Sequence, residues 1–246
     1  MIIELKGISD LAQQIDELKE KLFADGHLLL RGLFTKEELN EVRKEFQTVY
    51  SRLEARGTTK VAANEIVDND LLKYSVGQFS GAQTMARLFL ILYRKEENLS
   101  TIERIVFDKL IKIYEIIQGK AFSKEQLEAS DSFFTKRYQF YPSGGGFIGT
   151  HADTFNIETT KRLGGEFIQF VLPITQKGID YSEGGGYTMS NGELVSNEED
   201  SELGDLIVYD GSIEHGVADI EPSKPLDMNP SSGRIVMLTT LYKKMQ

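Results

Sequence analysis

The chain has 246 residues, no cysteine and a formal net charge of −10. Its length suits one domain with a substantial core, and the acidic balance disfavours nucleic acid, whose phosphates require clustered Lys and Arg. Without cysteine, any metal site must use His and carboxylate ligands. No segment resembles an export signal or a membrane span, so we expect a cytoplasmic protein without a membrane partner.

The residues before 131 show mainly helical periodicity, interrupted by one or two early strands. One helix start is marked by Thr35 and Glu38, which form a capping-box signature. The predicted elements, in chain order, are a helix over 8–23, a short strand over 27–34, a helix from 35 onwards, helices near 81–95 and over 100–118, and a loop or lid over 57–80.

After residue 131 the pattern changes to short runs rich in aromatic and β-branched residues, bounded by Gly, Pro, Asn or Asp. Five such runs without βαβ alternation predict a barrel or jelly roll and argue against a doubly wound fold. We therefore expect one α+β domain over 1–246, with a helical part over 1–130 packed on a jelly-roll core over 131–246. Within that core, "SNEEDSE" (196–202) is expected to be a solvated loop.

Two of the three histidines lie in segments that favour metal chemistry. His151 and Asp153 follow a glycine run in "GGGFIGTHAD", although this pair alone describes a hydrogen-bonded turn equally well. His215 follows a strand and a turn in "GDLIVYDGSIEHG". Two His and one carboxylate from separate strands form the facial triad suited to non-haem Fe(II), which leaves coordination positions open. The sequence thus predicts His151, Asp153 and His215 as catalytic metal ligands.

Arg234 opens the last apolar strand, "GRIVMLTTLY". A guanidinium inside a barrel is costly unless an anion meets it, and a carboxylate is its natural bidentate partner. A 2-oxo acid can fill two open positions of a facial triad, with O₂ in the third, while Arg234 holds the distal carboxylate of the acid. The alternative is that Arg234 is a surface strand residue.

The order of these motifs, with "EGGGYTM" between the two histidines, resembles the Fe(II)/2-oxoglutarate-dependent dioxygenases of the double-stranded β-helix fold. The resemblance covers about 133–243 closely, and "GHLLLRGLFTKEELNEVRKEF" near the N-terminus more loosely. It implies that 2-oxoglutarate and O₂ yield succinate and CO₂ while an unactivated C–H bond is oxidised. The family's halogenating members leave the carboxylate position vacant, so Asp153 points to hydroxylation or a related oxidation.

"YPSGGGFIGTHAD" also resembles prolyl-hydroxylase-like members, in which a Tyr ten residues before the first ligand His faces the cosubstrate. Tyr141 holds that place here. Alternation along the strand puts Gln139 on the same face, so both are predicted to bind the cosubstrate. The gap from His215 to Arg234 is longer than in many members, which leaves Lys224 as the alternative basic anchor.

The favoured interpretation is an oxygenase acting on a small molecule, an amino acid or a specialised metabolite, with a pocket shaped by the loops 57–80, 154–164 and 221–232. One alternative is an oxygenase acting on a protein or peptide, which predicts an exposed groove beside the iron. Another is a non-catalytic jelly-roll binding protein, which predicts no O₂-dependent release of succinate. The third histidine, His27, is predicted to have no catalytic role, and the oligomeric state is not predicted.

Overall fold

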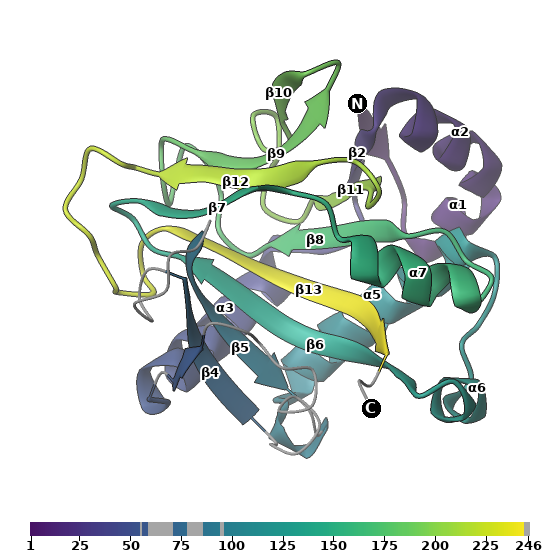
Figure 1. Cartoon of the computed structure of the whole chain (residues 1–246), viewed down its shortest axis with the longest axis horizontal. Coiled ribbons are helices and arrows are strands. Elements are labelled where there is room, and N and C mark those ends of the chain that lie inside the picture. The colour runs from purple at the N-terminus through teal and green to yellow at the C-terminus, as the bar shows by residue number, and fades with distance from the viewer. Residues whose placement is uncertain (55, 59–70, 78–85, 94–95, 244–246) are drawn as a thin grey trace.

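The computed structural model describes residues 1–54, 56–58, 71–77, 86–93 and 96–243 (Figure 1). Its strands are β1 (Ile2–Glu4), β2 (His27–Arg31), β3 (Arg56–Thr58), β4 (Leu71–Gly77), β5 (Ala86–Tyr93), β6 (Ser132–Tyr141), β7 (Gly146–His151), β8 (Ile168–Pro173), β9 (Gly185–Ser190), β10 (Glu193–Ser196), β11 (Leu206–Asp210), β12 (His215–Ile220) and β13 (Arg234–Lys243). Its α-helices are α1 (Ile8–Gln13), α2 (Ile15–Asp25), α3 (Lys36–Arg52), α5 (Thr101–Gln118), α6 (Lys124–Ala129) and α7 (Thr154–Arg162), with one 3-10 turn at Glu96–Asn98.

The strands form one continuous hydrogen-bonded path in the order β1-β2-β11-β8-β13-β6-β5-β7-β12-β9-β10, and β3 and β4 branch from β5. Pairing between the described strands is antiparallel except for β1 with β2 and β3 with β4. Figure 1 shows β7, β9 and β12 in one layer and β6, β8 and β13 in another. This antiparallel, folded-over sheet is the jelly-roll core expected from the sequence.

Alternation along β6 and β13 separates a helix-facing core from the interior of the roll. Tyr138 and Phe140 on β6 pack with the helices, where the ring centroids of Phe46 on α3 and Tyr138 lie 5.1 Å apart. Gln139 and Tyr141, which point to the opposite face of β6, line a cavity inside the roll. Because a strand repeats every two residues, one sequence supplies both surfaces.

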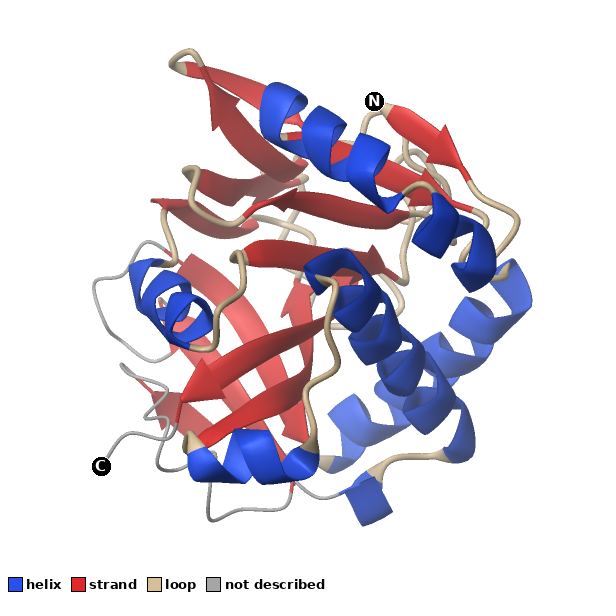
Figure 2. Cartoon of the chain, turned by 90° about the vertical axis from the view of Figure 1, so that its right-hand side faces the viewer, coloured by secondary structure: helices blue, strands red, loops and turns tan. Residues whose placement is uncertain are grey.

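The long helices α2, α3 and α5 pack on one face of the sheet, whereas α7 lies apart from them against β13. Figure 2 shows the long helices gathered on one side of the strands. Both α3 and α5 begin with a complete capping box, Thr35 with Glu38 and Ser100 with Glu103, so the predicted starts of both helices are confirmed. The other face of the sheet is left to close on itself and to enclose the cavity.

The helix predicted near 81–95 is wrong where the structure describes this segment. Residues 86–93, "ARLFLILY", form β5, which pairs with β4, β6 and β7. Periodicity cannot distinguish a short apolar run in a buried strand from one in a buried helix, and here three strand partners decide. Residues 81–85 and 94–95 lie outside the described residues.

Other boundaries also differ from the prediction. The helix expected over 8–23 is two helices, α1 and α2, which meet at Gln14. The segment 57–80, expected as a loop or lid, contains the end of β3 and all of β4, and 59–70 and 78–80 lie outside the described residues. The described residues before 131 therefore form five strands, where the sequence predicts one or two.

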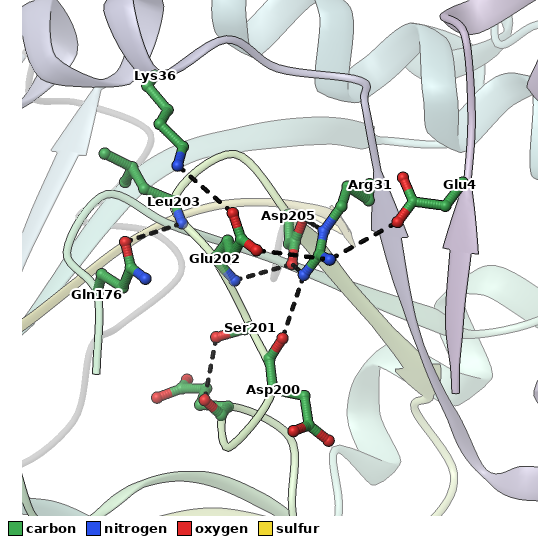
Figure 3. Close-up of polar contacts among 10 residues, drawn as sticks. Glu4, Arg31, Lys36, Gln176, Asp200, Ser201, Glu202, Leu203 and Asp205 are labelled. Carbon is green, nitrogen blue, oxygen red and sulfur yellow. Dashed lines mark hydrogen bonds and ion pairs between the residues drawn. The ribbon is translucent and has the colours of Figure 1, made fainter. Parts of the chain in front are cut away.

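Arg31 on β2 ties the edge of the sheet to the segment before β11. Its guanidinium donates to Asp205 at 2.9 and 2.7 Å, and its Nη1 lies 3.6 Å from both Glu4 and Glu202 (Figure 3). The Asp205 side chain is buried, and its hydrogen bond raises the pKa of Arg31. Residues 200–205 are consequently held against β2.

The start of α5 carries a buried polar cluster. The carboxylate of Glu103, 1 % exposed, accepts hydrogen bonds from the hydroxyls of Tyr93 and Tyr138, each at 2.8 Å, and from the backbone N–H of Ser100 at 2.9 Å. Glu103 therefore caps the helix and joins it to β5 and β6.

We expect Glu103→Ala to lower the free energy of unfolding by about 3 kcal/mol, because two buried hydroxyls and a helix cap lose their acceptor. The measurement is urea unfolding followed by circular dichroism. Lys112→Ala, on the same helix with a side chain 58 % exposed, is the control and should change stability by about 0.5 kcal/mol or less. Equal effects of the two substitutions would contradict a structural role for the Glu103 cluster.

Candidate metal centre

The antiparallel pairing of β7 with β12 brings two histidines together. His151 is the last residue of β7, His215 is the first of β12, and their Cα atoms are register partners. The two ring centroids lie 4.5 Å apart. Asp153 follows β7 directly, and its carboxylate oxygens lie 3.9 Å from His151 Nε2 and 3.7 Å from His215 Nε2. One ligand atom from each residue falls within 4.8 Å of the other two.

Backbone carbonyls fix which nitrogen of each imidazole can bind a metal. His151 Nδ1 lies 2.9 Å from the carbonyl oxygen of Gly149, and His215 Nδ1 lies 3.0 Å from that of Ile213. A carbonyl only accepts, so in each ring Nδ1 carries the proton and donates. Both Nε2 atoms, which face Asp153, are left with a free lone pair, the arrangement that orients ligand histidines in metal sites.

Asp153 is held in its charged form. Burial raises its pKa, but the interactions with His215, and more weakly with His151 and Arg137, outweigh burial and lower the pKa overall. The side chains of His215, Asp153 and His151 are 6, 23 and 28 % exposed, so the cluster lies at the wall of a cavity. Two imidazoles and one carboxylate with preset donor atoms fit a divalent transition metal of the Fe(II) type.

A cavity of about 220 Å³ adjoins the cluster. Its lining brings together all six residues that the sequence predicted as site residues, namely His151, Asp153, His215, Arg234, Tyr141 and Gln139. The hydroxyl of Tyr141 donates to Gln139 Oε1 at 2.8 Å, and the Arg234 guanidinium carbon lies 5.1 Å from the centroid of the Tyr141 ring. Tyr141 is buried, which raises its pKa to about 12, so its hydroxyl is a donor at neutral pH.

Arg234 has a carboxylate partner within the protein. Its Nε donates to Glu198 at 2.8 and 3.1 Å, and its Nη2 donates to the same carboxylate. Tyr181 donates to Glu198 as well. Arg234 is 3 % exposed and Glu198 is 1 % exposed. Burial raises the pKa of Glu198, but the charge of Arg234 outweighs burial and lowers the pKa overall, so the pair is ionic. Arg234 Nη1 makes no hydrogen bond to a described residue and remains available.

Glu198 is the residue that sequence reasoning missed. It lies in "SNEEDSE", expected as a solvated loop, yet Asn197 and Glu198 are buried and only the acidic residues after them are exposed. An acidic run gives no sign of which carboxylate turns inward. The buried Arg234 was itself the signal, because a guanidinium in a roll requires an anionic partner.

Several other predicted positions lie away from the cavity. Lys224 is half-exposed and donates to Glu221 at 2.6 Å. The described side chains of 154–164 and 221–232 do not line the cavity, which differs from the expectation that these loops shape the pocket; 154–162 form α7. His27, for which the sequence predicts no catalytic role, lies on β2 and is not among the residues that line the cavity.

Comparison with known proteins places the fold. No family model matches the sequence, and no curated protein matches it. Solved structures do match: a Trichoplax adhaerens prolyl hydroxylase in complex with a hypoxia inducible factor peptide is 10 % identical, with 96 % of this chain and 92 % of that chain covered and a TM-score of 0.64. The α-ketoglutarate dependent epimerase SnoN from nogalamycin biosynthesis is 10 % identical, covering 94 and 83 %, with a TM-score of 0.57.

A third similar structure is a 2OG-Fe(II) oxygenase family protein from Caulobacter crescentus, 13 % identical, covering 98 and 86 %, with a TM-score of 0.53. The chain has the double-stranded β-helix fold of the 2OG-Fe(II) oxygenases. The fold class predicted from the sequence is thereby confirmed. Among the described residues of this oxygenase fold, no helix combines the length and apolarity that a membrane crossing requires.

The Arg234–Glu198 pair predicts a pH-dependent loss of stability in Glu198→Gln. At pH 7 the variant leaves Arg234 buried without a countercharge, and we expect about 3 to 5 kcal/mol less free energy of unfolding. The pKa of Glu198 is lowered in the folded protein, so its charge stabilises fully above the ordinary Glu pKa of about 4.3. That contribution is lost as the pH falls through the lowered pKa, and the difference between wild type and variant should narrow below about pH 4.

Urea unfolding at pH 7 and at pH 3.5 measures this difference. The control is Glu199→Gln, whose side chain is 68 % exposed in a surface ion pair and whose loss should change stability by about 1 kcal/mol or less at both pH values. A difference for Glu198→Gln that stays constant with pH would show that charge is not its cause.

Proposed function

We propose that this protein is an Fe(II)- and 2-oxoglutarate-dependent oxygenase that oxidises a C–H bond of a small molecule, by hydroxylation or a related reaction. The single observation that carries the proposal is the His151–Asp153–His215 cluster, with both Nε2 atoms free and turned to one carboxylate at the wall of a cavity. Fe(II) bound there would supply O₂ activation and redox chemistry, which the side chains of the protein do not provide.

The protein's own groups bind, orient and exclude water. The carbonyls of Gly149 and Ile213 keep the proton on Nδ1 of each histidine, so metal binding requires no change of tautomer. Asp153 contributes a charged carboxylate at neutral pH. The apolar lining, which includes Val217 and Ile207, keeps bulk water from the remaining faces of the cavity.

Arg234, Tyr141 and Gln139 are proposed to hold the distal carboxylate of 2-oxoglutarate, with the single O–H of Tyr141 turning from Gln139 Oε1 to the carboxylate and the Gln139 amide N–H donating to it. Glu198 neutralises the Arg234 charge and fixes the guanidinium through Nε and Nη2, which leaves Nη1 for the ligand. Hydrogen bonding and shape, rather than net charge, then select the cosubstrate. Lys224 is unsuited to this role because Glu221 holds it outside the cavity.

A small-molecule substrate is favoured by the modest volume of the cavity, about 220 Å³, which must also hold the cosubstrate. The prolyl hydroxylase neighbour carries a peptide, and the SnoN neighbour belongs to nogalamycin biosynthesis, so the fold itself serves both classes of substrate. The non-catalytic alternative is decided by whether 2-oxoglutarate is consumed with O₂.

Loss of a ligand side chain should weaken metal binding without unfolding the protein. We expect His151→Ala and Asp153→Ala to weaken Fe(II) binding by about tenfold or more and to eliminate the visible charge-transfer band that anaerobic Fe(II) and 2-oxoglutarate produce with wild type. His27→Ala, the substitution of the histidine outside the cavity, should keep both. A wild type that binds no iron and shows no band, and that releases no succinate with O₂, would refute the proposed function.

The proposed role of Arg234 is tested best in a charge-balanced variant. Arg234→Ala alone leaves Glu198 buried and unpaired, so we choose Arg234→Gln/Glu198→Gln, with Glu198→Gln as its matched single variant. The double variant should bind Fe(II) normally, while the 2-oxoglutarate concentration for half-maximal band intensity rises roughly 10- to 100-fold, the equivalent of one or two charge-assisted hydrogen bonds. An unchanged 2-oxoglutarate requirement would assign the anchor to another residue.

A further inference from the structure

The cavity contains a second buried arginine that the proposed function does not use. Arg137 on β6 is 8 % exposed and lines the same cavity as the metal cluster. It lies on the same strand face as Gln139 and Tyr141, two and four residues away, and Tyr141 is the register partner of Arg234. At about 3.3 Å per residue, the two arginines therefore lie roughly 13 Å apart along β6.

Arg137 differs from Arg234 in its partners. Its Nη1 donates to the Tyr242 hydroxyl at 2.7 Å and its Nη2 to Thr240 Oγ1 at 3.2 Å, both neutral groups, and its Nε has no hydrogen-bond partner. No carboxylate of a described residue lies within ion-pair distance of it. Burial lowers its pKa, but the surrounding oxygens, Tyr242 first, raise it overall, so the guanidinium is charged.

A buried cation with five N–H groups, of which two are bonded, is stabilised when an anion accepts from it. The carboxylate that contributes to the raised pKa of Arg137 is that of Asp153, but Asp153 is one of the proposed metal ligands. Arg234, in contrast, has a full carboxylate partner in Glu198. Of the two arginines in this cavity, Arg137 is therefore the one without an anionic partner among the described residues.

The residues around Arg137 indicate the chemistry of the rest of such a ligand. Its register partners are Leu92 on β5 and Leu238 on β13, and both line the cavity. Gln169 on β8, 3 % exposed, also lines it, and its Oε1 has no hydrogen-bond partner. The wall thus offers a cation, an apolar surface and an amide acceptor that requires a donor.

We propose that Arg137 binds the carboxylate of the substrate, and that the substrate is a small carboxylic acid with an apolar body, the apolar amino acids being its simplest members. Leu92 and Leu238 contact the apolar body, and Gln169 accepts from an amino or hydroxyl group. Arg137 lines the same cavity as His151, Asp153 and His215, so a carboxylate held at Arg137 keeps the rest of the substrate in the cavity that adjoins the metal cluster. This inference rests on the proposed function, because it assigns the substrate of the same site.

The test compares free acids with their primary amides. The probes are leucine, isoleucine, valine, proline and phenylalanine, the same compounds without the amino group, and the primary amide of each. Each is titrated by calorimetry into wild type loaded with Mn(II) and 2-oxoglutarate, so that binding is measured without turnover. We expect at least one acid to bind about tenfold or more tightly than its amide. Wild type that prefers no acid over its amide overturns the proposal.

Variants assign the preference to Arg137. Arg137→Gln should abolish the preference for acids while the affinities for Mn(II) and 2-oxoglutarate stay within about twofold of wild type. Arg137→Lys keeps the charge without the planar fork, should retain part of the preference, and serves if the Gln variant does not fold. Arg162→Gln, on the exposed face of α7, is the control and should bind like wild type.

The outcomes separate this inference from the function on which it rests. If Arg137→Gln instead raises the requirement for 2-oxoglutarate and leaves the acid preference intact, Arg137 holds the cosubstrate and the proposal is wrong. If wild type forms no absorption band with Fe(II) and 2-oxoglutarate, the oxygenase proposal fails on that separate measurement. The acid-against-amide titration, repeated on metal-free protein, still decides whether Arg137 binds a carboxylate.

Discussion

The antiparallel pairing of β6 with β13 is the constraint on which both the core and the site depend. Ten residues of each strand are in register, from Arg234 opposite Tyr141 to Lys243 opposite Ser132. A shift by one residue would move every side chain of one strand to the other face. In a shifted β6, Tyr138 would enter the cavity, while Gln139 and Tyr141 would face the helices.

Long-range pairing also assembles the metal cluster. His151 and His215 are 64 positions apart, and only the register of β7 with β12 places them side by side. Gly149 within β7 and Ile213 just before β12 then supply the carbonyls that fix the tautomer. The backbone therefore determines both the positions of the two histidines and the orientation of their rings.

Much of this could be predicted from the sequence because the signals were local or chemically costly. The capping boxes at Thr35 and Ser100 and the alternation in β6 are short-range patterns, and a buried Arg234 demanded an anion. The secondary structure of "ARLFLILY" could not be predicted, because a short apolar run is compatible with a helix or a strand until its partners are known. The same is true of Glu198, which is one carboxylate in an acidic run and becomes distinct only through its contact with Arg234.

His151, His215 and Asp153 are proposed to bind iron together, beside a cosubstrate held at Arg234. X-ray diffraction at the iron absorption edge, from crystals grown anaerobically with Fe(II) and 2-oxoglutarate, tests this proposal most directly. We expect one anomalous peak between His151 Nε2, His215 Nε2 and the Asp153 carboxylate, with 2-oxoglutarate density extending from it to Arg234. An absent peak, or iron bound only elsewhere on the protein, would contradict the proposal.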